Sequence, residues 1–350
     1  MDKKPALVTG GCGFVGRHLV RALLERGDSI YIIDNLSTGK HPDQWLGGDK
    51  LSDADGRLEY RVGEQTVTFI RADLLSYLHA RVDGGVVDEL PAFGDVFHLA
   101  SIVGGRALID GDPMRVATDL GIDAIFFLWA TRRKDKIDRL LYASSSAAYP
   151  TQLQAEGNVI RLQEPMITFD GTTLGQPDMT YGWSKLTGEY LATIAARQYG
   201  MSVACVRPFS GYGEDQDPSY PVPAIALRVA RRENPMTVWG TGEQGRDFIH
   251  IDDCVAFMLY ILDHVHDGRG VNIGTGVLTS FNQLIALLSR IEGYSAEIQQ
   301  LLDKPVGVHN RVCDPVVMQW LGWKPKITIE EGMRRVLAHA HVRITDINAL

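Results

Sequence analysis

The chain has 350 residues, of which 45% are hydrophobic and 22% charged, and its formal net charge is −8. This composition suits a globular protein with one large domain or two closely joined ones, and the acidic balance argues against a nucleic-acid partner. No run approaches the ~20 apolar residues of a membrane span, so we expect a cytoplasmic protein without a membrane segment. The four cysteines are scattered without metal-binding spacing, which predicts reduced core thiols and no metal site.

The first half of the chain alternates short apolar runs with longer amphipathic stretches. The apolar runs predict strands at residues 6–8, 29–33, 67–70, 95–99, 140–143 and 202–207. The amphipathic stretches predict helices at residues 14–26, 74–90, 114–131 and 181–199. This alternation predicts an α/β fold with a doubly wound parallel sheet of the Rossmann type.

Other segments depart from this rhythm. Residues 41–63 are rich in Gly and Asp, and we expect a surface excursion there. Residues 152–178 read as a long loop, and loops of this length are often functional lids. After about residue 223, helices with isolated short strands take over, which predicts a smaller C-terminal α/β domain.

A glycine-rich turn follows the first predicted strand and opens the first helix. Gly10 permits the tight turn, Gly13 clears space for a pyrophosphate, and Gly16 lets helix and strand pack closely. The backbone N–H groups at the helix start, including those of Phe14 and Val15, then face the phosphates. Because the glycines have the required strand–turn–helix setting, we predict a dinucleotide site.

Asp34 ends the second strand, where a carboxylate can bind both ribose hydroxyls and repel a 2′-phosphate. It therefore predicts NAD as the cofactor. His98, after the fourth strand, is expected to be a packed residue. The remaining cofactor contacts are predicted along the strand ends, at Asn35, Asp73, Leu74, Leu99, Ala100 and Ser101.

Tyr181 and Lys185 lie at positions i and i+4 of a predicted helix, one above the other on the same face. A neighbouring ammonium favours the phenolate form of a tyrosine, so Tyr181 can take a proton from a hydroxyl. Lys185 can also bind the nicotinamide ribose. Ser145 and Ser146 follow another predicted strand, and a hydroxyl there can hydrogen-bond the reacting oxygen.

These motifs, in this order, resemble the extended short-chain dehydrogenase/reductase family, and within it the nucleotide-sugar epimerases and dehydratases. The resemblance spans nearly the whole chain and rests on TGGCGFVG, DNLSTG, HLAS, YASSSAAYP, YGWSK, RPFSGYG, GRDFIHIDD, NIGTG and LGW. It implies an NAD-binding Rossmann domain at 1–207 and a domain at 208–350 mainly for a nucleoside-diphosphate sugar, with segments crossing back. It also implies a homodimer through a four-helix bundle of helices 114–131 and 181–199.

The resemblance places the catalytic hydroxyl at Ser145, four residues before Tyr149. The position two before Tyr149 is Glu in sugar 4,6-dehydratases and Cys in GDP-mannose 3,5-epimerases, but Ala147 here. A methyl group exchanges no proton, which favours chemistry at C4 alone. We therefore expect a nucleotide-sugar 4-epimerase acting through a 4-keto intermediate. A net C4 dehydrogenase or reductase is the alternative, ahead of a 3,5-epimerase-like enzyme or a 4,6-dehydratase.

Five further residues are implied to bind substrate. Arg246 resembles the arginine that holds the substrate diphosphate, with Arg311 as its partner, because a guanidinium suits phosphate. Trp239 is expected beside the nucleotide base. Ser210 stands where the family commonly has Asn, and Arg106 follows a glycine-rich loop that resembles a sugar-contacting loop of 3,5-epimerases.

A non-enzymatic NAD(H) sensor or scaffold is the alternative from another class of protein. The intact set of Ser145, Tyr181 and Lys185 argues against it, because a sensor does not need these groups. The sequence leaves the nucleotide and the sugar open.

Overall fold

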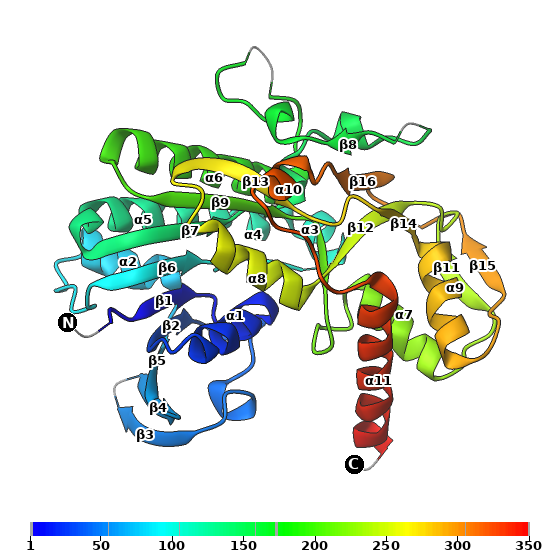
Figure 1. Ribbon diagram of the computed structural model, residues 1–350, viewed down its shortest axis with the longest axis horizontal. Coiled ribbons are helices and arrows are strands. Elements are labelled where there is room, and N and C mark those ends of the chain that lie inside the picture. Colours follow the sequence, from blue (N-terminus) through cyan, green and yellow to red (C-terminus); the bar gives the residue numbers. More distant parts are fainter. Residues whose placement is uncertain are drawn as a thin grey trace.

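The computed structural model describes residues 3–348 apart from 55, 105, 158, 172–173 and 305, and it leaves out the side chains of residues 106, 107, 347 and 348. Its main element is a nine-stranded sheet with helices on both faces (Figure 1). In spatial order the strands are β13 (Asp267–Ile273), β9 (Val203–Pro208), β7 (Ile137–Ala143), β6 (Phe93–His98), β1 (Ala6–Thr9), β2 (Ile30–Asp34), β5 (Gln65–Arg71), β4 (Arg57–Val62) and β3 (Asp49–Ala54).

The sheet is doubly wound, as predicted. Strand β1 pairs in parallel with β2 on one side and with β6 on the other. The chain first adds β5 beyond β2, then returns to build β6, β7, β9 and β13 in the opposite direction, all in parallel. The reversal between β1 and β6 places a crevice at the carboxyl ends of these strands, where open α/β sheets bind their ligands.

Alternating residues of the strands feed two separate cores. In β1, Ala6 and Val8 face one core, whereas Leu7 faces the other. The first core is covered by α1 (Phe14–Glu25), α8 (Ile251–Ile261) and α10 (Val316–Trp320). The second is covered by α2 (Leu74–Val82), α5 (Asp119–Arg132) and α6 (Met179–Tyr199), with α3 (Arg106–Gly111) and α4 (Pro113–Val116) nearby.

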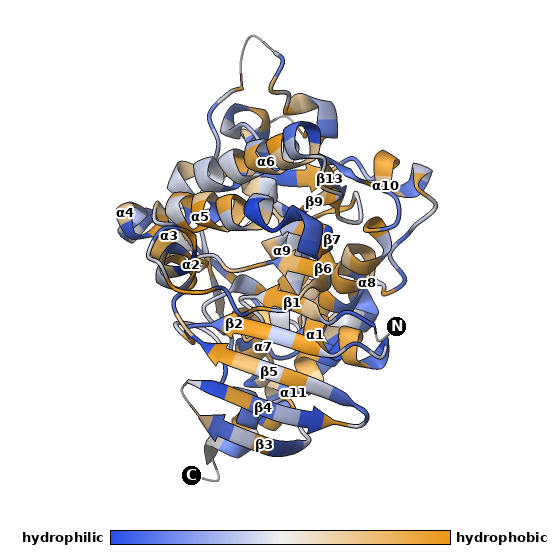
Figure 2. Cartoon of the chain, turned by 90° about the vertical axis from the view of Figure 1, so that its left-hand side faces the viewer, coloured by the Kyte–Doolittle hydropathy of each residue, from blue (hydrophilic) through white to orange (hydrophobic). Residues whose placement is uncertain are grey.

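The expected surface excursion at 41–63 is wrong in part, because the segment forms a hairpin that extends the sheet. Strand β4 pairs antiparallel with β5, and β3 pairs antiparallel with β4. Leu58 and Tyr60 of β4 are buried, whereas β3 is exposed along its whole length. Figure 2 shows the more hydrophilic colouring of these two strands beside β2 and β5. The two-residue alternation of Leu58 and Tyr60 in β4 is short, and the many Gly and Asp residues on either side of it favour a loop when the sequence is read alone.

Two predicted helices are shorter than expected. Helix α2 ends at Val82 rather than at residue 90, because Gly84 and Gly85 follow and Gly85 adopts a φ of +73°. The helix predicted at 114–131 is interrupted between α4 and α5. Just after the break, the buried Asp119 carboxylate at the start of α5 accepts hydrogen bonds from the Ser101 hydroxyl and the Ile102 N–H.

The C-terminal part combines a second sheet with a small helical core. This sheet has the order β10 (Ser210–Tyr212), β12 (Gly245–His250), β16 (Asn310–Cys313) and β8 (Arg161–Leu162), with β14 (Leu278–Ser280) beside β12. The helical core packs α7 (Pro221–Ala230), α9 (Phe281–Glu292) and α11 (Ile329–Asn348) against the strand pair β11 (Met236–Trp239) and β15 (Ile298–Leu301). In the chain, α8 and β13 come between β12 and β14, but in space they belong to the large sheet and its first core (Figure 1).

Short 3-10 turns complete the description. They are η1 (Pro42–Gln44), η2 (Lys134–Lys136), η3 (Ser146–Ala148), η4 (Thr151–Gln154) and η5 (Glu164–Met166). Two of them, η4 and η5, lie in the segment 152–178, which also contributes β8. This segment is therefore attached by strand pairing to β16 rather than being a loop without regular structure.

Candidate active site

The glycine-rich turn packs closely against the backbone at the end of β6 and against the start of α1. A Cβ on Gly10 would lie 2.8 Å from the backbone nitrogen of Ala100, and a Cβ on Gly16 would lie 2.3 Å from the carbonyl oxygen of Gly10. Gly13 is the N-cap of α1, so the free N–H groups of Phe14 and Val15 begin the helix. The turn therefore has the close backbone approach and the helix N-terminus that a dinucleotide pyrophosphate needs.

Asp34 stands at the end of β2 beside this turn. Its carboxylate accepts hydrogen bonds from the backbone N–H groups of Cys12 (2.9 Å) and Leu36 (2.7 Å). Burial raises the pKa of Asp34, while these two bonds and Arg17 oppose the shift. Each carboxylate oxygen has a second lone pair, so the group can still accept from ribose hydroxyls.

Asn35 and Asp73 link the ends of β2 and β5. The Asn35 amide donates to Asp73 at 3.4 Å, and Asp73 caps α2 by accepting from the Ser76 N–H at 3.0 Å. Asp73 therefore has a structural partner in addition to its predicted contact with the cofactor. Leu74, the first residue of α2, is buried in the adjoining core.

The end of β6 is fixed by hydrogen bonds. Leu99 N–H donates to the carbonyl of Thr9 at 3.1 Å, and Ala100 N–H donates to its hydroxyl at 3.3 Å. His98 lies between Thr9 (2.7 Å) and Asp123 (3.0 Å) and stacks on Phe126, so it is packed, as expected. Burial lowers its pKa despite the neighbouring Asp123 carboxylate.

Tyr181 and Lys185 occupy the first turns of α6. The Lys185 ammonium lies 5.8 Å from the centroid of the Tyr181 ring and donates to the carbonyl of Ala143 at 3.2 Å. Lys185 is only 3% exposed. Burial alone would lower its pKa, but the phenolate form of Tyr181 and the carboxylates of Asp123 and Asp119 raise it. The ammonium form therefore persists next to the tyrosine.

Ser145 lies just beyond β7, where it starts η3 and accepts from the Ala147 N–H at 3.1 Å. Ser146 and Ala147 behind it are buried. The turn is joined to α6, because the N–H of Asp178 donates to the carbonyl of Ala147 at 3.0 Å. The structure thus brings the predicted Ser145 and Tyr181 segments against each other.

Arg246 and Arg311 lie on adjacent parallel strands in direct register, so their side chains start on the same face of the second sheet. The Arg246 guanidinium lies 5.8 Å from the Phe281 ring and donates to backbone carbonyls of Gly245 and His309. Arg311 donates to Gln154 at 2.6 Å and pairs with Asp178 at 2.9 Å. It therefore joins the segment 152–178 to the start of α6.

Three other predicted substrate residues lie on separate elements. Ser210 is the first residue of β10 and half-buried, and Trp239 is the last residue of β11 and 49% exposed. Arg106 begins α3, and its side chain lies outside the described part of the chain.

Several residues at this site were not foreseen from the sequence. Gln154 and Asp178 hold Arg311, and Gly182 allows α6 to approach the turn after β7. Glu189 and Arg207 form a buried ion pair behind that turn. Gly182 and Arg207 lie within the quoted motifs YGWSK and RPFSGYG, and Glu189 lies about two turns after Tyr181 on the same helix, but no role was predicted for any of the three.

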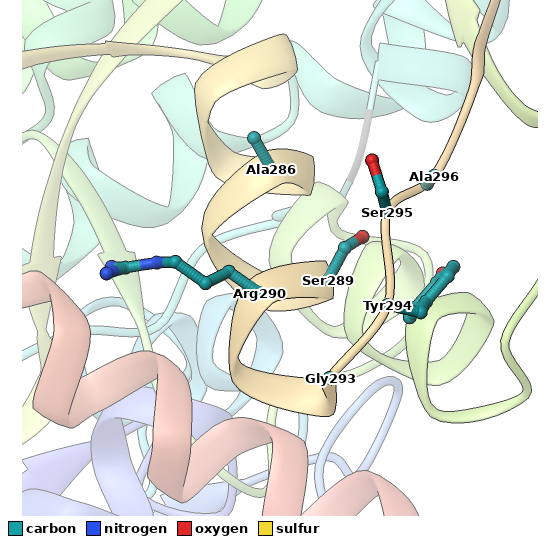
Figure 3. A pocket seen from close by; sticks show the side chains of 7 residues that line it. All are labelled: Ala286, Ser289, Arg290, Gly293, Tyr294, Ser295 and Ala296. Atoms are coloured by element: carbon teal, nitrogen blue, oxygen red, sulfur yellow. The ribbon is translucent and has the colours of Figure 1, made fainter.

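A hollow of about 480 Å³ lies elsewhere, beside the end of α9 (Figure 3). Ser289, Arg290, Tyr294 and Ser295 are among the residues that line it. The Arg290 guanidinium extends to α11, where it donates to Glu330. None of the predicted site residues lines this hollow, so it is separate from the candidate active site.

The described residues hold no cluster of His, Cys, Asp and Glu suited to a metal ion. All four cysteines are free and buried, which confirms the predicted core thiols. Within the described ranges, no helix has the length and apolar character that crossing a membrane requires.

Comparison with known proteins defines the class. Residues 6–274 match the model of the NAD dependent epimerase/dehydratase family. The chain belongs to this family, and its cofactor is accordingly NAD. The Gly10–Gly16 turn and the Asp34 carboxylate fit this cofactor.

Individual relatives are moderately similar over nearly the full length. A putative UDP-glucose 4-epimerase of Methanocaldococcus jannaschii is 29% identical over 95% of this chain and 96% of its own. A UDP-glucose 4-epimerase of Thermotoga maritima, solved with UDP-glucose, is 26% identical with a TM-score of 0.76, covering 97% and 99% of the two chains. A Thermus thermophilus UDP-glucose 4-epimerase in complex with NAD is 23% identical with a TM-score of 0.71, covering 96% and 98%.

Proposed function

We propose that this protein is an NAD-dependent nucleotide-sugar 4-epimerase that acts through a 4-keto sugar. The observation that carries the proposal is the joining of the Ser145 turn to the helix of Tyr181 and Lys185, with the buried Ala147 at the position where an extra acid or base would stand. Two curated relatives named as UDP-glucose epimerases, at 29% and 28% identity, support this assignment.

The cofactor is held by the Gly10–Gly16 turn, by Phe14 and Val15 at the helix start, and by Asp34. The strand-end residues Asn35, Asp73, Leu74, Leu99, Ala100 and Ser101 line its path in this proposal. When bound, NAD supplies the group that accepts hydride from C4 and returns it to the sugar.

The chain's own residues handle the proton. Tyr181, as phenolate, takes the proton from the C4 hydroxyl and returns it when the alcohol is restored. The Lys185 ammonium stabilises that phenolate, and its raised pKa keeps it charged. The Ser145 hydroxyl, held at the start of η3, hydrogen-bonds the reacting oxygen and orients it toward Tyr181.

Arg246 and Arg311 hold the diphosphate in this proposal, because two guanidinium groups in cross-strand register match a pair of anionic phosphates. Trp239 packs on the nucleotide base, and Ser146, Ser210 and Arg106 contact the sugar side. Residues from 208 onward thus mainly bind the nucleotide sugar. The exceptions are β13, which completes the large sheet, and α8 and α10, which cover its first core.

We also propose a homodimer through α5 and α6, two helices that lie side by side on one face of the sheet (Figure 1). They expose large apolar side chains that a soluble monomer would leave in water, namely Leu120, Leu128, Trp183 and Tyr190, each 38–47% exposed. Pairing these helices with those of a second copy forms a four-helix bundle.

The experiment is incubation of the purified protein with a panel of UDP-, GDP- and dTDP-sugars, read by NMR. Interconversion of C4 epimers without net NADH formation is expected. Accumulation of a 4-ketosugar with NADH would instead identify a dehydrogenase. Tyr181→Phe should retain NAD binding and lose turnover, whereas Tyr199→Phe, an exposed tyrosine at the end of the same helix, should change neither. Full turnover by Tyr181→Phe would reject the proposed proton transfer.

A further inference from the structure

An ion pair lies directly behind the candidate active site. The Arg207 guanidinium, at the end of β9, pairs with the Glu189 carboxylate of α6 through two hydrogen bonds of 2.8 and 2.7 Å. Their side chains are 3% and 1% exposed. Nearby charges, mainly that of Glu189, raise the pKa of Arg207 although burial alone would lower it. In this dry setting the two hydrogen bonds hold both side chains in one geometry.

The pair binds both ends of the turn that carries Ser145. Ser144, one residue before it, donates its hydroxyl to Glu189. Tyr149, four residues after it, accepts from Arg207 at 3.0 Å through its buried hydroxyl. Because Glu189 lies on the same helix as Tyr181 and Lys185, these bonds tie the Ser145 turn to the helix of the proposed base.

The same set of bonds continues into the segment 152–178. The Tyr149 hydroxyl donates to the side chain of Asn272 in β13 at 2.8 Å. The Asn272 amide then donates to the carbonyl of Leu162 at 2.9 Å, and its backbone N–H donates to the Glu164 carboxylate at 3.0 Å. The segment whose β8 pairs with the Arg311 strand is thereby joined to the catalytic turn.

We propose that Glu189 and Arg207 are positioning residues for the reaction, with Ser144, Tyr149 and Asn272 as their links. They hold the Ser145 hydroxyl in place relative to Tyr181. The distance between these two groups then depends on the position of residues 161–164, which the same hydrogen bonds hold. The inference rests on the proposed function for its catalytic part. Its structural part, that the turn and residues 161–164 are held by one network, stands on the hydrogen bonds alone.

The test uses substitutions that break a link without stranding a buried charge. Tyr149→Phe removes the hydroxyl between Arg207 and Asn272, and Ser144→Ala removes the bond to Glu189. Tyr60→Phe is the control, because the Tyr60 hydroxyl of β4 also donates one hydrogen bond, to Asp43 in η1, far from the candidate active site. Glu189→Gln is less informative, since an unpaired buried Arg207 can prevent folding.

For turnover we expect Tyr149→Phe and Ser144→Ala to lower kcat about 10-fold or more with little change in KM, as displacement of a catalytic group predicts. NAD affinity should equal that of the wild type, and Tyr60→Phe should match the wild type in every respect. The probe is whichever nucleotide sugar of the panel the wild-type protein converts. A wild-type kcat in both variants would overturn the positioning role.

Amide hydrogen exchange on the full-length protein supplies a readout that needs no substrate. Tyr149→Phe should raise exchange both at residues 144–149 and at residues 161–164, with no change in the β3–β4 hairpin. Faster exchange in only one of the two segments, or in neither, would overturn the network. If the wild type converts no sugar in the panel, the proposed function fails, and the exchange result still decides whether the network exists.

Discussion

Gly182 lies against the carbonyl of Ala147 so closely that a Cβ at residue 182 would sit 2.4 Å from that oxygen. The same oxygen accepts the N–H of Asp178, the N-cap of α6. The glycine after Tyr181 therefore sets how near α6, the helix of the proposed base, comes to the Ser145 turn.

Replacing Gly182 should push helix α6 away from the Ser145 turn. In Gly182→Ala the new methyl group meets backbone, which cannot rotate away, so we expect kcat to fall at least about 10-fold and unfolding free energy to drop by about 1–3 kcal/mol. Gly121→Ala in α5 is the control, since its Cβ would make only an ordinary 3.6 Å contact with Leu75. Activity assays and chemical denaturation measure both effects. Equal activity of the two variants would contradict the prediction.

Asp34→Asn should weaken NAD binding. Both carboxylate oxygens accept a backbone N–H, so an amide would place its own N–H₂ against the N–H of Cys12 or Leu36. Calorimetric titration is expected to show about a 10-fold or larger loss of NAD affinity, corresponding to about 1.4 kcal/mol or more. The preference for NAD over NADP should also become smaller, because the negative charge that repels a 2′-phosphate is gone. Unchanged NAD affinity would show that Asp34 does not contact the cofactor.

Arg246→Gln and Arg311→Gln should each raise KM for the converted nucleotide sugar by about 10- to 100-fold, because each removes a charge-assisted bond worth about 1.5–3 kcal/mol. Arg311→Gln also leaves Asp178 without this partner at the start of α6, so it should lower kcat as well. Arg290→Gln, whose guanidinium reaches the exposed Glu330, serves as the control. Steady-state kinetics separates the two parameters; a KM unchanged in both variants would reject the diphosphate site.

His18 should stabilise the fold more at acidic than at alkaline pH. Burial alone lowers its pKa, but the carboxylates of Asp215 (2.9 Å) and Asp252 (3.4 Å) raise it above the ordinary 6.5. A raised pKa adds stability that is fully present below 6.5 and is lost as pH rises through the folded-state value. The difference in unfolding free energy between wild type and His18→Gln should therefore shrink between pH 6 and pH 9, as measured by urea denaturation. The exposed His79→Gln is the control, and a difference that grows with pH would contradict the assignment.

Leu128→Glu should dissociate the proposed dimer. It places a charge in the exposed apolar stripe of α5, where a second copy would have to desolvate it. Light scattering after size exclusion is expected to show a monomer for this variant and a dimer for the wild type. Val342→Glu, which changes an exposed apolar residue on α11, should leave the dimer intact. A monomeric wild type would exclude the bundle.

The sequence predicted the parts of the site that are local in the chain. The glycine turn, Asp34 and the Tyr181–Lys185 spacing depend on neighbours within one turn or one strand, and these local elements form as predicted. The ion pair of Glu189 and Arg207 could not be predicted in this way, because it depends on the burial of both side chains. Arg207 is buried since its strand, β9, lies between β7 and β13 in the sheet. The pairing of β8 with β16 likewise joins residues about 150 positions apart, which no local pattern records.

The return of β13 and α8 to the large sheet bears on how the protein is made. Leu19 and Val20 of α1 share a core with Phe257 and Ile261 of α8, and β9 has β13 as its outer neighbour. On the ribosome, the first 208 residues therefore emerge with an apolar face on α1 and an open edge on β9, and the edge stays uncovered until β13, which ends at Ile273, has left the exit tunnel. At typical synthesis rates of about 5–20 residues per second, this leaves an interval of several seconds in which a chaperone can bind the uncovered helix face and strand edge.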